Sequence, residues 1–388
     1  MEVYLVGGAV RDELLGLPVG ERDWVVVGSS PGEMLRLGYR QVGRDFPVFL
    51  HPDTGEEYAL ARTERKQGRG YRGFEVHASP EVSLQEDLKR RDLTINAMAK
   101  SLSGEVIDPY GGQRDLGAGH LRHVSAAFVE DPLRILRAAR FAARFSALGF
   151  RIADETMRLL RDMVGAGELE DVPRERIWEE TRRALATPSP GVFFDVLHRL
   201  NATGQVYSGM ADVLFSEPAR RLAQAALASI VPLDDEPCVR FAVLVGGLCF
   251  HRDESVTRGA LEVALQPGIP GQCRELLELT VNFQHACHGA LELDAAALLK
   301  LLHRLDGKRR PERFARLLRI CSAVYAAAKG QDEYPQADWL RNTSGRIEAL
   351  DTRRYIGNLT DGQEVADRLE QARLQLLEEM IGERGSPG

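Results

Sequence analysis

The fold is decided by residues 3–27, which read VYLVGGAVRDELLGLPVGERDWVVV. Val3–Val6 is apolar and rich in β-branched and aromatic residues, which predicts a strand. The pair Gly7-Gly8 follows at once, and glycine lets a backbone turn sharply and come close to a ligand. The apolar spacing after this pair predicts a short helix that begins near Arg11, and Trp24–Val27 predicts a second, buried strand.

Two features of this stretch carry chemistry. Gly8 and Arg11 place bare backbone N–H groups and a guanidinium at the start of a helix, a combination suited to phosphate. Glu21 and Asp23 are two apart on extended chain, so both carboxylates point the same way and could serve as catalytic ligands of Mg²⁺. A solvated acidic turn is the alternative interpretation, and the phosphate-type glycine turn upstream favours the metal site.

Four motifs occur in a fixed order along the chain: GGAVRD at 7–12, an acid-x-Asp-Trp element at 21–24, RRDLTINAMA at 90–99 and EDPLRILRAARFAARF at 130–145. In these motifs the chain resembles the class II tRNA nucleotidyltransferases, which are the CCA-adding enzymes and whose relatives include bacterial poly(A) polymerases. The resemblance is dense over residues 1–185 and thin after that.

The resemblance implies an α+β fold. A small mixed-sheet, polymerase-β-like nucleotidyltransferase head is expected at residues 1–122, a helical neck with the nucleotide-selecting helix at 123–187, and a helical, tRNA-binding body and tail at 188–388. The residues agree with this division. They predict a helix at 31–37, short strands at 39–42, 47–50 and 56–61, a last strand and a turn-rich exit within 105–121, and mostly helix beyond residue 188.

Asp131-Pro132 predicts the start of a helix, and one face of that helix carries Arg134, Arg137, Arg140 and Arg144. These arginines have no acidic partner four residues away among them, so they would repel one another, and a nucleoside triphosphate would relieve the repulsion. The alternative is an amphipathic helix whose arginines are merely solvated.

The resemblance also assigns roles within the nucleotide site. Arg91 would contact phosphate, Asp92 would lie near the ribose hydroxyls, and Arg137 and Arg140 would hold the triphosphate. Asp131 and Arg134 would read the base. A carboxylate accepts from the exocyclic amine that cytosine and adenine share, and arginine donates to ring acceptors, so uracil and guanine mismatch.

Three segments leave their role open. Glu57 could be a third acid beside the metal pair or a surface residue. Residues 62–75 are basic, glycine-rich and interleaved with aromatic residues, which suits either a mobile loop that contacts RNA or a solvated flexible loop. A basic stripe on a later helix is a candidate surface for the tRNA arm or a solvated face; it comprises Arg309, Arg310, Arg313, Arg316 and Arg319.

Composition limits the function classes. The formal net charge of −7 argues against promiscuous nucleic-acid binding and restricts RNA contact to a local basic surface. No apolar stretch approaches the ~18 residues that suggest a membrane span, and the first residues lack a signal-peptide pattern, so a cytoplasmic protein is expected. The five cysteines are widely spaced, which predicts neither a disulfide framework nor a zinc site; Cys287, between His285 and His288, is expected to be buried.

The chain departs from the family pattern twice. Glu21 stands where most members have aspartate; it reaches about 1.5 Å further and can still bind Mg²⁺. Many relatives carry a His-Asp phosphohydrolase motif after the neck, but here Val245-Gly246-Gly247-Leu248 occupies that place. Glycine has no side chain to bind a metal, so no phosphohydrolase activity is expected.

The sequence therefore predicts a Mg²⁺-dependent enzyme that adds and repairs the CCA end of tRNA from CTP and ATP, without a nucleic-acid template and with release of pyrophosphate. Three alternatives remain: a poly(A) polymerase, an enzyme that adds only CC or only A, and a binding protein with a degraded site. Intact Asp23, Arg91, Asp131 and Arg134 argue against the last.

Overall fold

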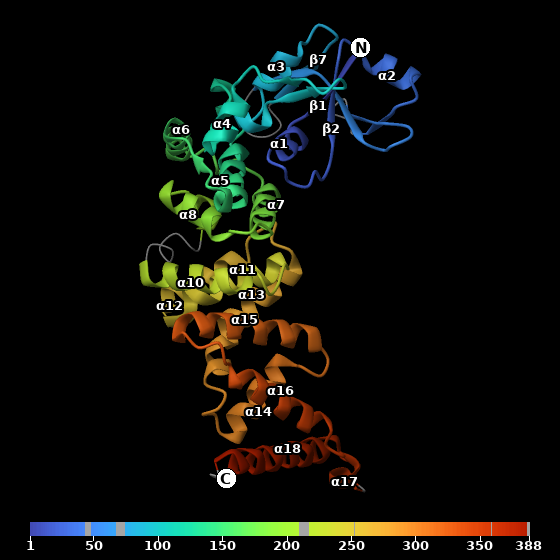
Figure 1. The fold of residues 1–388 in the computed structure, drawn as a ribbon. Helices are drawn as coiled ribbons and strands as arrows, with labels where there is room; N and C mark the ends of the chain where they lie inside the picture. Colours follow the sequence, from blue (N-terminus) through green and yellow to red (C-terminus); the bar gives the residue numbers. More distant parts are fainter. Residues whose placement is uncertain (43–47, 67–73, 209–216, 252, 358, 386–388) are drawn as a thin grey trace. The chain divides into compact units, whose positions relative to one another are not determined.

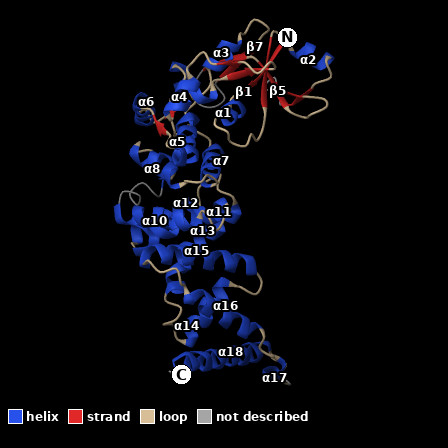
Figure 2. Ribbon diagram, in the orientation of Figure 1, coloured by secondary structure: helices blue, strands red, loops and turns tan. Residues whose placement is uncertain are grey.

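The computed structural model describes residues 1–42, 48–66, 74–208, 217–251, 253–357 and 359–385. The chain forms two compact units, Met1–Val206 and Tyr207–Gly388. The first unit combines a sheet with helices, whereas the described residues of the second contain helices and connecting loops (Figures 1 and 2). This α+β architecture is the one that the sequence predicts.

A mixed sheet of seven strands lies at the centre of the first unit. In spatial order its strands are β3 (Arg40–Val42), β4 (Val48–Leu50), β5 (Glu57–Leu60), β2 (Asp23–Val27), β1 (Glu2–Val6), β8 (Ala99–Ser101) and β9 (Val106–Ile107). β2 and β5 run parallel, and the other neighbours in this order are antiparallel. Apolar side chains fill both faces of the sheet, with Val25 on one and Val26 on the other.

Helix α1 (Gly8–Leu14) begins earlier than the predicted start near Arg11. Gly7 takes a φ of 70°, which turns the chain directly from β1 into the helix, and the Arg11 N–H donates to the Gly7 carbonyl. The glycine pair is therefore the helix start itself rather than a loop before it.

The other helices of the first unit follow the predicted order. Ser30 caps α2 and Ser83 caps α3, the latter in a capping box with Glu86. Helix α5 contacts both α7 and α8. The bounds are α2 (Pro31–Arg36), α3 (Leu84–Lys89), α4 (Gly112–Ala118), α5 (Leu133–Phe145), α6 (Asp154–Gly165), α7 (Arg174–Leu185), α8 (Gly191–Arg199) and α9 (Thr203–Val206).

Two loop predictions in the first unit need correction. The predicted loop at 62–75 is wrong at both ends, because β6 (Arg62–Lys66) pairs antiparallel with β7 (Phe74–Ala78); residues 67–73 lie outside the described part. The turn-rich segment at 105–121 contains helix α4. Its glycines lie at the two ends of the helix, and the Asp108 carboxylate accepts from the N–H groups of Gly112 and Gln113.

A short parallel pair completes the first unit. β10 (His120–Leu121) lies beside β11 (Arg151–Ile152), so the chain that leaves the sheet is tied to the segment that follows α5. The pair fixes both ends of the region that contains α5.

The second unit is helical throughout its regular elements, as expected beyond residue 188. A buried cluster built around Leu298, Leu318 and Leu340 joins its later helices. The bounds are α10 (Glu217–Ile230), α11 (Pro237–Leu248), α12 (Glu254–Ala264), α13 (Gly271–His288), α14 (Ala295–Leu305), α15 (Pro311–Lys329), α16 (Pro335–Glu348), α17 (Arg353–Ile356) and α18 (Gly362–Gly385).

The basic stripe on α15 is largely neutralised within the second unit. Arg310 and Arg313 both pair with Glu275, and Arg316 Nε lies 3.0 Å from Glu236 Oε2. Arg319 pairs with Asp234. These carboxylates come from other elements of the bundle, so the stripe also ties helices together, and its role as a tRNA surface stays a prediction.

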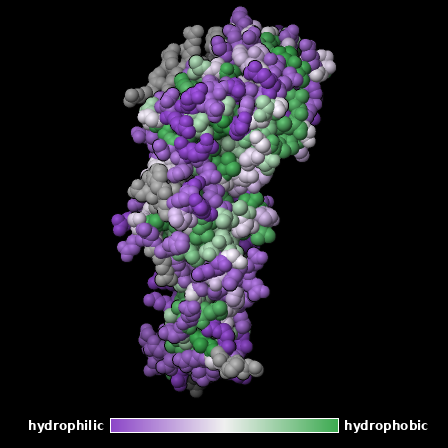
Figure 3. All heavy atoms as spheres, turned by 60° about the vertical axis from the view of Figure 1, so that its left-hand side comes forward, coloured by the Kyte–Doolittle hydropathy of each residue, from purple (hydrophilic) through white to green (hydrophobic). Residues whose placement is uncertain are grey.

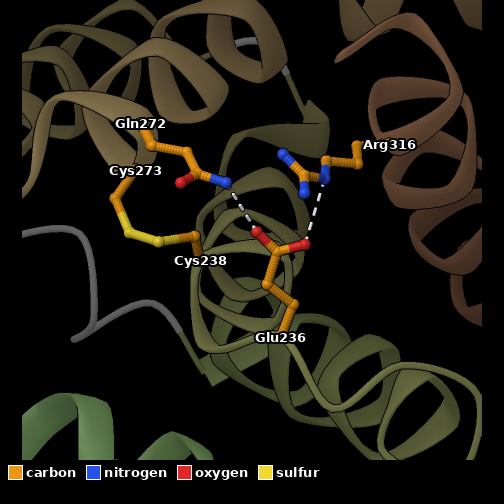
Figure 4. The surroundings of a disulfide bond; sticks show 5 residues. All are labelled: Glu236, Cys238, Gln272, Cys273 and Arg316. Atoms are coloured by element: carbon orange, nitrogen blue, oxygen red, sulfur yellow. Dashed lines mark hydrogen bonds and ion pairs between the residues drawn. A yellow bond between two sulfur atoms is a disulfide. The ribbon is translucent and has the colours of Figure 1, made fainter. Parts of the chain in front are cut away.

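The cysteine prediction is wrong for one pair, because Cys238 and Cys273 form a disulfide between the first turns of α11 and α13 (Figure 4). Beside the bond, the Glu236 carboxylate accepts from Gln272 Nε2 and Arg316 Nε, so the same corner also includes α15 (Figure 4). Cys287 is buried and free, as expected, and so are Cys249 and Cys321.

The surface of the protein is mixed in character. On the face drawn in Figure 3, hydrophilic residues are interspersed with hydrophobic patches. Among the described residues, no helix has the length and apolar character that a membrane span requires.

Replacement of Cys238 tests the disulfide. Cys238→Ser should lower the free energy of unfolding by about 3–4 kcal/mol without reductant, because the bond spans a sequence separation of 35 residues and restricts the unfolded chain. Urea unfolding of both proteins, with and without dithiothreitol, measures the effect. Cys249→Ser is the matched control and should keep the wild-type response to the reductant. Equal stability of wild type and Cys238→Ser without reductant would contradict the assignment.

Candidate active site

The first unit contains an open pocket of about 570 Å³, a volume typical of small-molecule sites. It is bordered by the glycine turn before α1, the ends of β2 and β5, the segment after α3, and helices α5 and α7. Nine of the ten predicted site residues line it: Gly8, Arg11, Asp23, Arg91, Asp92, Asp131, Arg134, Arg137 and Arg140. Glu21 is the tenth and does not.

The glycine turn brings two guanidinium groups to one wall of the pocket. A Cβ atom at Gly7 would lie 2.8 Å from Arg91 Nη1, and one at Gly8 would lie 3.3 Å from Arg11 Nη2. Glycine is favoured at position 7 by its φ of 70°, and the absence of a Cβ lets Arg91 lie against the turn. The result is a concave surface of backbone N–H groups and arginine suited to a phosphate.

Arg11 is buried, with 2% of its surface exposed, and several groups hold its side chain in place. Its guanidinium lies over the Phe145 ring, 4.9 Å from the centroid, and its Nε donates to Asp12 Oδ1 over 2.8 Å. Burial lowers the pKa of Arg11, and the charge of Asp12 opposes this. The Phe141 and Phe145 rings set the plane of the guanidinium, and the Asp12 carboxylate compensates its positive charge.

The acidic wall consists of Asp23 and Glu57. They are register partners on the parallel strands β2 and β5, so their side chains leave the same face of the sheet about 5 Å apart. Both are exposed to the pocket. Burial raises the pKa of Asp23, while Arg91 opposes the rise and Glu21 adds to it. The sequence left open whether Glu57 lies near the predicted metal ligands. The structure places it beside Asp23.

These carboxylates keep their oxygens available. Among the described residues, the side chains of Glu21, Asp23 and Glu57 accept no hydrogen bond and form no ion pair. No group of three or more potential metal ligands is preassembled in the described part of the chain. Two adjacent hard-oxygen donors still fit Mg²⁺, which takes most of its ligands from water and substrate phosphate.

The arginine stripe of α5 meets carboxylates from other elements. Arg137 pairs with Asp92, Arg140 with Glu180 of α7, and Arg144 with Asp12 of α1. The repulsion expected from the sequence is therefore relieved within the protein and does not by itself require a nucleotide. Sequence spacing could not show this, because every partner lies far away along the chain.

Asp92 is the most constrained of these acids, at 6% exposed. It accepts from the Leu93 N–H over 2.8 Å, from Asn96 Nδ2 over 3.0 Å and from Arg137 Nε over 2.8 Å. Burial alone would raise the pKa of Asp92, but these donors hold it far below its ordinary value. The carboxylate predicted to lie near ribose is thus committed to Arg137 and Asn96.

The residues predicted to read the base are oriented by the backbone. Asp131 Oδ1 accepts from the Leu133 N–H over 3.1 Å, and Asp131 Oδ2 lies 3.5 Å from Arg176 Nη2. Arg134 donates to the carbonyls of Ala127 and Arg90, the former over 2.7 Å. Both side chains line the same pocket as the acidic wall.

Six further polar residues line the pocket without having been predicted there: Arg62, Arg90, Asn96, Arg144, Arg176 and Arg183. Weak signals existed for some of them. Asn96 lies inside the RRDLTINAMA motif, Arg144 belongs to the arginine face of α5, and Arg176 lies in the expected neck at 123–187. None of these signals distinguished a pocket residue from a solvated one.

Two protein-family models match the chain. The "Poly A polymerase head domain" matches residues 3–122, and the "Probable RNA and SrmB- binding site of polymerase A" matches residues 149–214. The glycine turn and the acidic wall lie within the first match, whereas α5 lies between the two.

Relatives that are similar over nearly the whole chain are also known. The "Multifunctional CCA protein" of Thioalkalivibrio sulfidiphilus is 46% identical and covers 99% of this chain and 100% of its own. The "CCA-adding enzyme" of Pseudomonas putida is 48% identical and covers 97% of this chain and 99% of its own.

Solved structures share the fold. The Bacillus stearothermophilus CCA-adding enzyme in complex with CTP has a TM-score of 0.68 at 24% identity and covers 98% of this chain and 93% of its own. The Thermotoga maritima CCA-adding enzyme complexed with tRNA has a TM-score of 0.62 at 24% identity, covering 98% and 90%. By the extent of its full-length relatives, the chain belongs to the family of bacterial CCA-adding enzymes, the class II tRNA nucleotidyltransferases.

Proposed function

We propose that this chain adds C, C and A to the 3′ end of tRNA and repairs incomplete ends, using CTP and ATP and releasing pyrophosphate without a nucleic-acid template. One observation carries the proposal: a single pocket joins two carboxylates that have no partner within the described part of the chain, a phosphate-type glycine turn and the Asp131–Arg134 pair. Relatives 46–48% identical over nearly the whole chain, named for CCA addition, support it.

A divalent cation, Mg²⁺ by the chemistry of the donor set, would be held by Asp23 and Glu57, with Glu21 as a further donor from the segment before β2. When bound, such an ion polarises phosphate and lowers the pKa of the attacking 3′-hydroxyl. Glu21 replaces the aspartate of most family members. We propose that Glu57 compensates for this change, because it gives Asp23 a carboxylate neighbour on the adjacent strand.

The chain's own residues would divide the nucleotide among them. Gly8 and Arg11 would receive phosphate at the glycine turn, with Arg91 above it. Arg137 and Arg140 would hold the triphosphate from α5. The fixed Asp131 carboxylate would accept from the base amine, and Arg134 would donate to ring acceptors. The tRNA 3′-hydroxyl would then attack the α-phosphorus in line, and pyrophosphate would leave.

The wider assignments remain part of the proposal. We propose a catalytic head at residues 1–122, a neck at 123–187, and a body and tail at 188–388 that contact tRNA, in a cytoplasmic enzyme. Because the disulfide Cys238–Cys273 would be unusual in the reducing cytosol, the stability of the protein under reductant also bears on this location.

A poly(A) polymerase is the second candidate, because both matching family models are named for that enzyme. Primer extension separates the two activities. Purified protein is incubated with tRNAs that end before C, after CC and after CCA, with CTP, ATP or both. A CCA-adding enzyme completes the first two and stops; a polymerase adds long A tails and ignores CTP. Addition of only CC or only A would indicate a partial enzyme, and no extension would indicate a binding protein.

Asp23→Ala tests the acidic wall. The variant should lose CMP incorporation by at least about a thousandfold, because one of the two adjacent ion ligands is gone, while CTP binding is partly retained through the arginines. Single-turnover extension and equilibrium CTP binding measure the two effects. Glu56→Ala, which removes a nearby carboxylate that bonds Trp24 instead, is the control. Unchanged turnover of Asp23→Ala would remove the assignment.

Arg134→Ala tests base reading. Incorporation of UMP and GMP should rise relative to CMP and AMP by about tenfold or more, because a donor to the ring acceptors is lost, with a smaller change in triphosphate affinity. Arg134→Lys keeps the charge but loses the planar fork, so it should also relax the choice of base. A uniform loss for all four nucleotides would contradict the role.

On α11, Gly246 and Gly247 stand where relatives carry the His-Asp motif, and the packing around them leaves no room for side chains that could bind a metal. A Cβ atom at Gly247 would lie 2.6 Å from Ala223 Cα, and one at Gly246 would lie within 3.1 Å of Thr280, Gln284 and Val324. We expect no hydrolysis of bis(p-nitrophenyl) phosphate with added Ni²⁺, Mn²⁺ or Mg²⁺. Turnover that copurifies with the protein and is abolished by chelator would refute this expectation.

A further inference from the structure

Asn96 joins the two sides of the pocket floor. It lies in the 3₁₀ turn Thr94–Asn96 and is 6% exposed. Its Oδ1 accepts from Arg11 Nη1, and its Nδ2 donates to Asp92 Oδ1 over 3.0 Å. A neutral amide therefore lies between a buried cation and a buried anion.

The Asn96 amide satisfies both neighbours at once. The Arg11 guanidinium can only donate, and the Asp92 carboxylate can only accept. A side chain between them must present an acceptor to one and a donor to the other, which fixes the orientation of the Asn96 amide. Alanine would leave both charged groups short of one hydrogen bond, and aspartate would place a second carboxylate against Asp92.

The amide completes a continuous polar chain. Starting from α5, the chain runs from Arg144 to Asp12 and Arg11 of α1, then through Asn96 to Asp92, and returns to α5 at Arg137. The phosphate-binding turn and the arginine stripe are thus linked at both ends. Asp131 and Arg134 are oriented by other groups: Asp131 accepts from the Leu133 N–H and pairs with Arg176, and Arg134 donates to the carbonyls of Ala127 and Arg90.

We propose that Asn96 is a positioning residue that holds Arg11 and the Asp92–Arg137 pair in one arrangement, so that the glycine turn and α5 grip the same nucleotide. The inference rests on the proposed function, and it adds a residue that acts through its neighbours. Because, among the described residues, the Asn96 side chain bonds Arg11 and Asp92 but neither Asp131 nor Arg134, we expect it to serve CTP and ATP equally.

Steady-state extension of tRNA by Asn96→Ala provides the first test. KM should rise about tenfold for CTP and by the same factor for ATP, the loss expected for one charge-assisted hydrogen bond, with kcat changed less than about threefold. Gln113→Glu, an amide-to-acid change at an exposed position of α4 outside the pocket, is the control and should match wild type. A loss confined to kcat, or one that differs between CTP and ATP, would overturn the proposal.

Asn96→Asp provides the second test, because it makes the effect depend on pH. At low pH the new carboxyl group keeps a proton and donates to Asp92 as the amide did. As pH rises that proton is lost, two adjacent carboxylates repel, and the arrangement breaks. The charged groups around position 96 are Arg11 and Asp12 from α1, Arg91 and Asp92 from the segment after α3, Asp115 from α4, and Arg137, Arg140 and Arg144 from α5.

KM for CTP of Asn96→Asp, divided by that of wild type, should therefore rise between about pH 6 and about pH 9, whereas the ratio for Gln113→Glu stays flat. A ratio independent of pH would overturn the proposal, and a merely structural role would not produce the slope. If Asn96→Ala fails to fold, as judged by thermal unfolding, the pH ratio decides alone. Absence of CMP and AMP incorporation by wild type would refute the proposed function instead, so the two failures are distinguishable.

Discussion

The buried carboxylate of Asp92 is the constraint on which the pocket depends. A desolvated anion without partners costs several kcal/mol, so the fold must bring donors to it. The Leu93 N–H is local, but Arg137 comes from α5 and Asn96 from the following turn. Satisfying one charge thereby fixes the position of α5 relative to the segment after α3 in the same unit. Through Asn96 the constraint extends to Arg11 and the glycine turn.

The pocket separates groups that hold it together from groups that can receive a ligand. Arg140 and Glu180 are both buried and paired with each other, and they join α5 to α7. Asp23 and Glu57 instead face the pocket, and among the described residues their carboxylates have no partner. Rigid paired charges preorganise the walls, whereas the unpaired oxygens keep the coordination capacity that a hard cation needs. This division explains how a strongly charged pocket remains both stable and available.

The second unit uses the same chemistry for another purpose. The arginines of α15 meet carboxylates from neighbouring elements, and Glu236 accepts from both Gln272 and Arg316 beside the Cys238–Cys273 bond. Gly246 and Gly247 allow α11 to pack closely against its neighbours, where relatives with the His-Asp motif would carry metal ligands. In this chain, α11 is therefore held by close packing at Gly246 and Gly247 and, at its start, by the disulfide and the Glu236 contacts.

The local features could be predicted from the amino-acid sequence: the Gly7 turn, the strand that carries Asp23, the arginine face of α5 and the helical character beyond residue 188. Each of these depends on spacing within a few residues, which periodicity and turn chemistry reveal. Only the tertiary structure decided that Glu57 is the neighbour of Asp23, that Asp92, Glu180 and Asp12 neutralise the α5 arginines, and that Cys238 meets Cys273. Those contacts join residues distant along the chain, and their geometry arises from how the elements pack, which a local pattern does not encode.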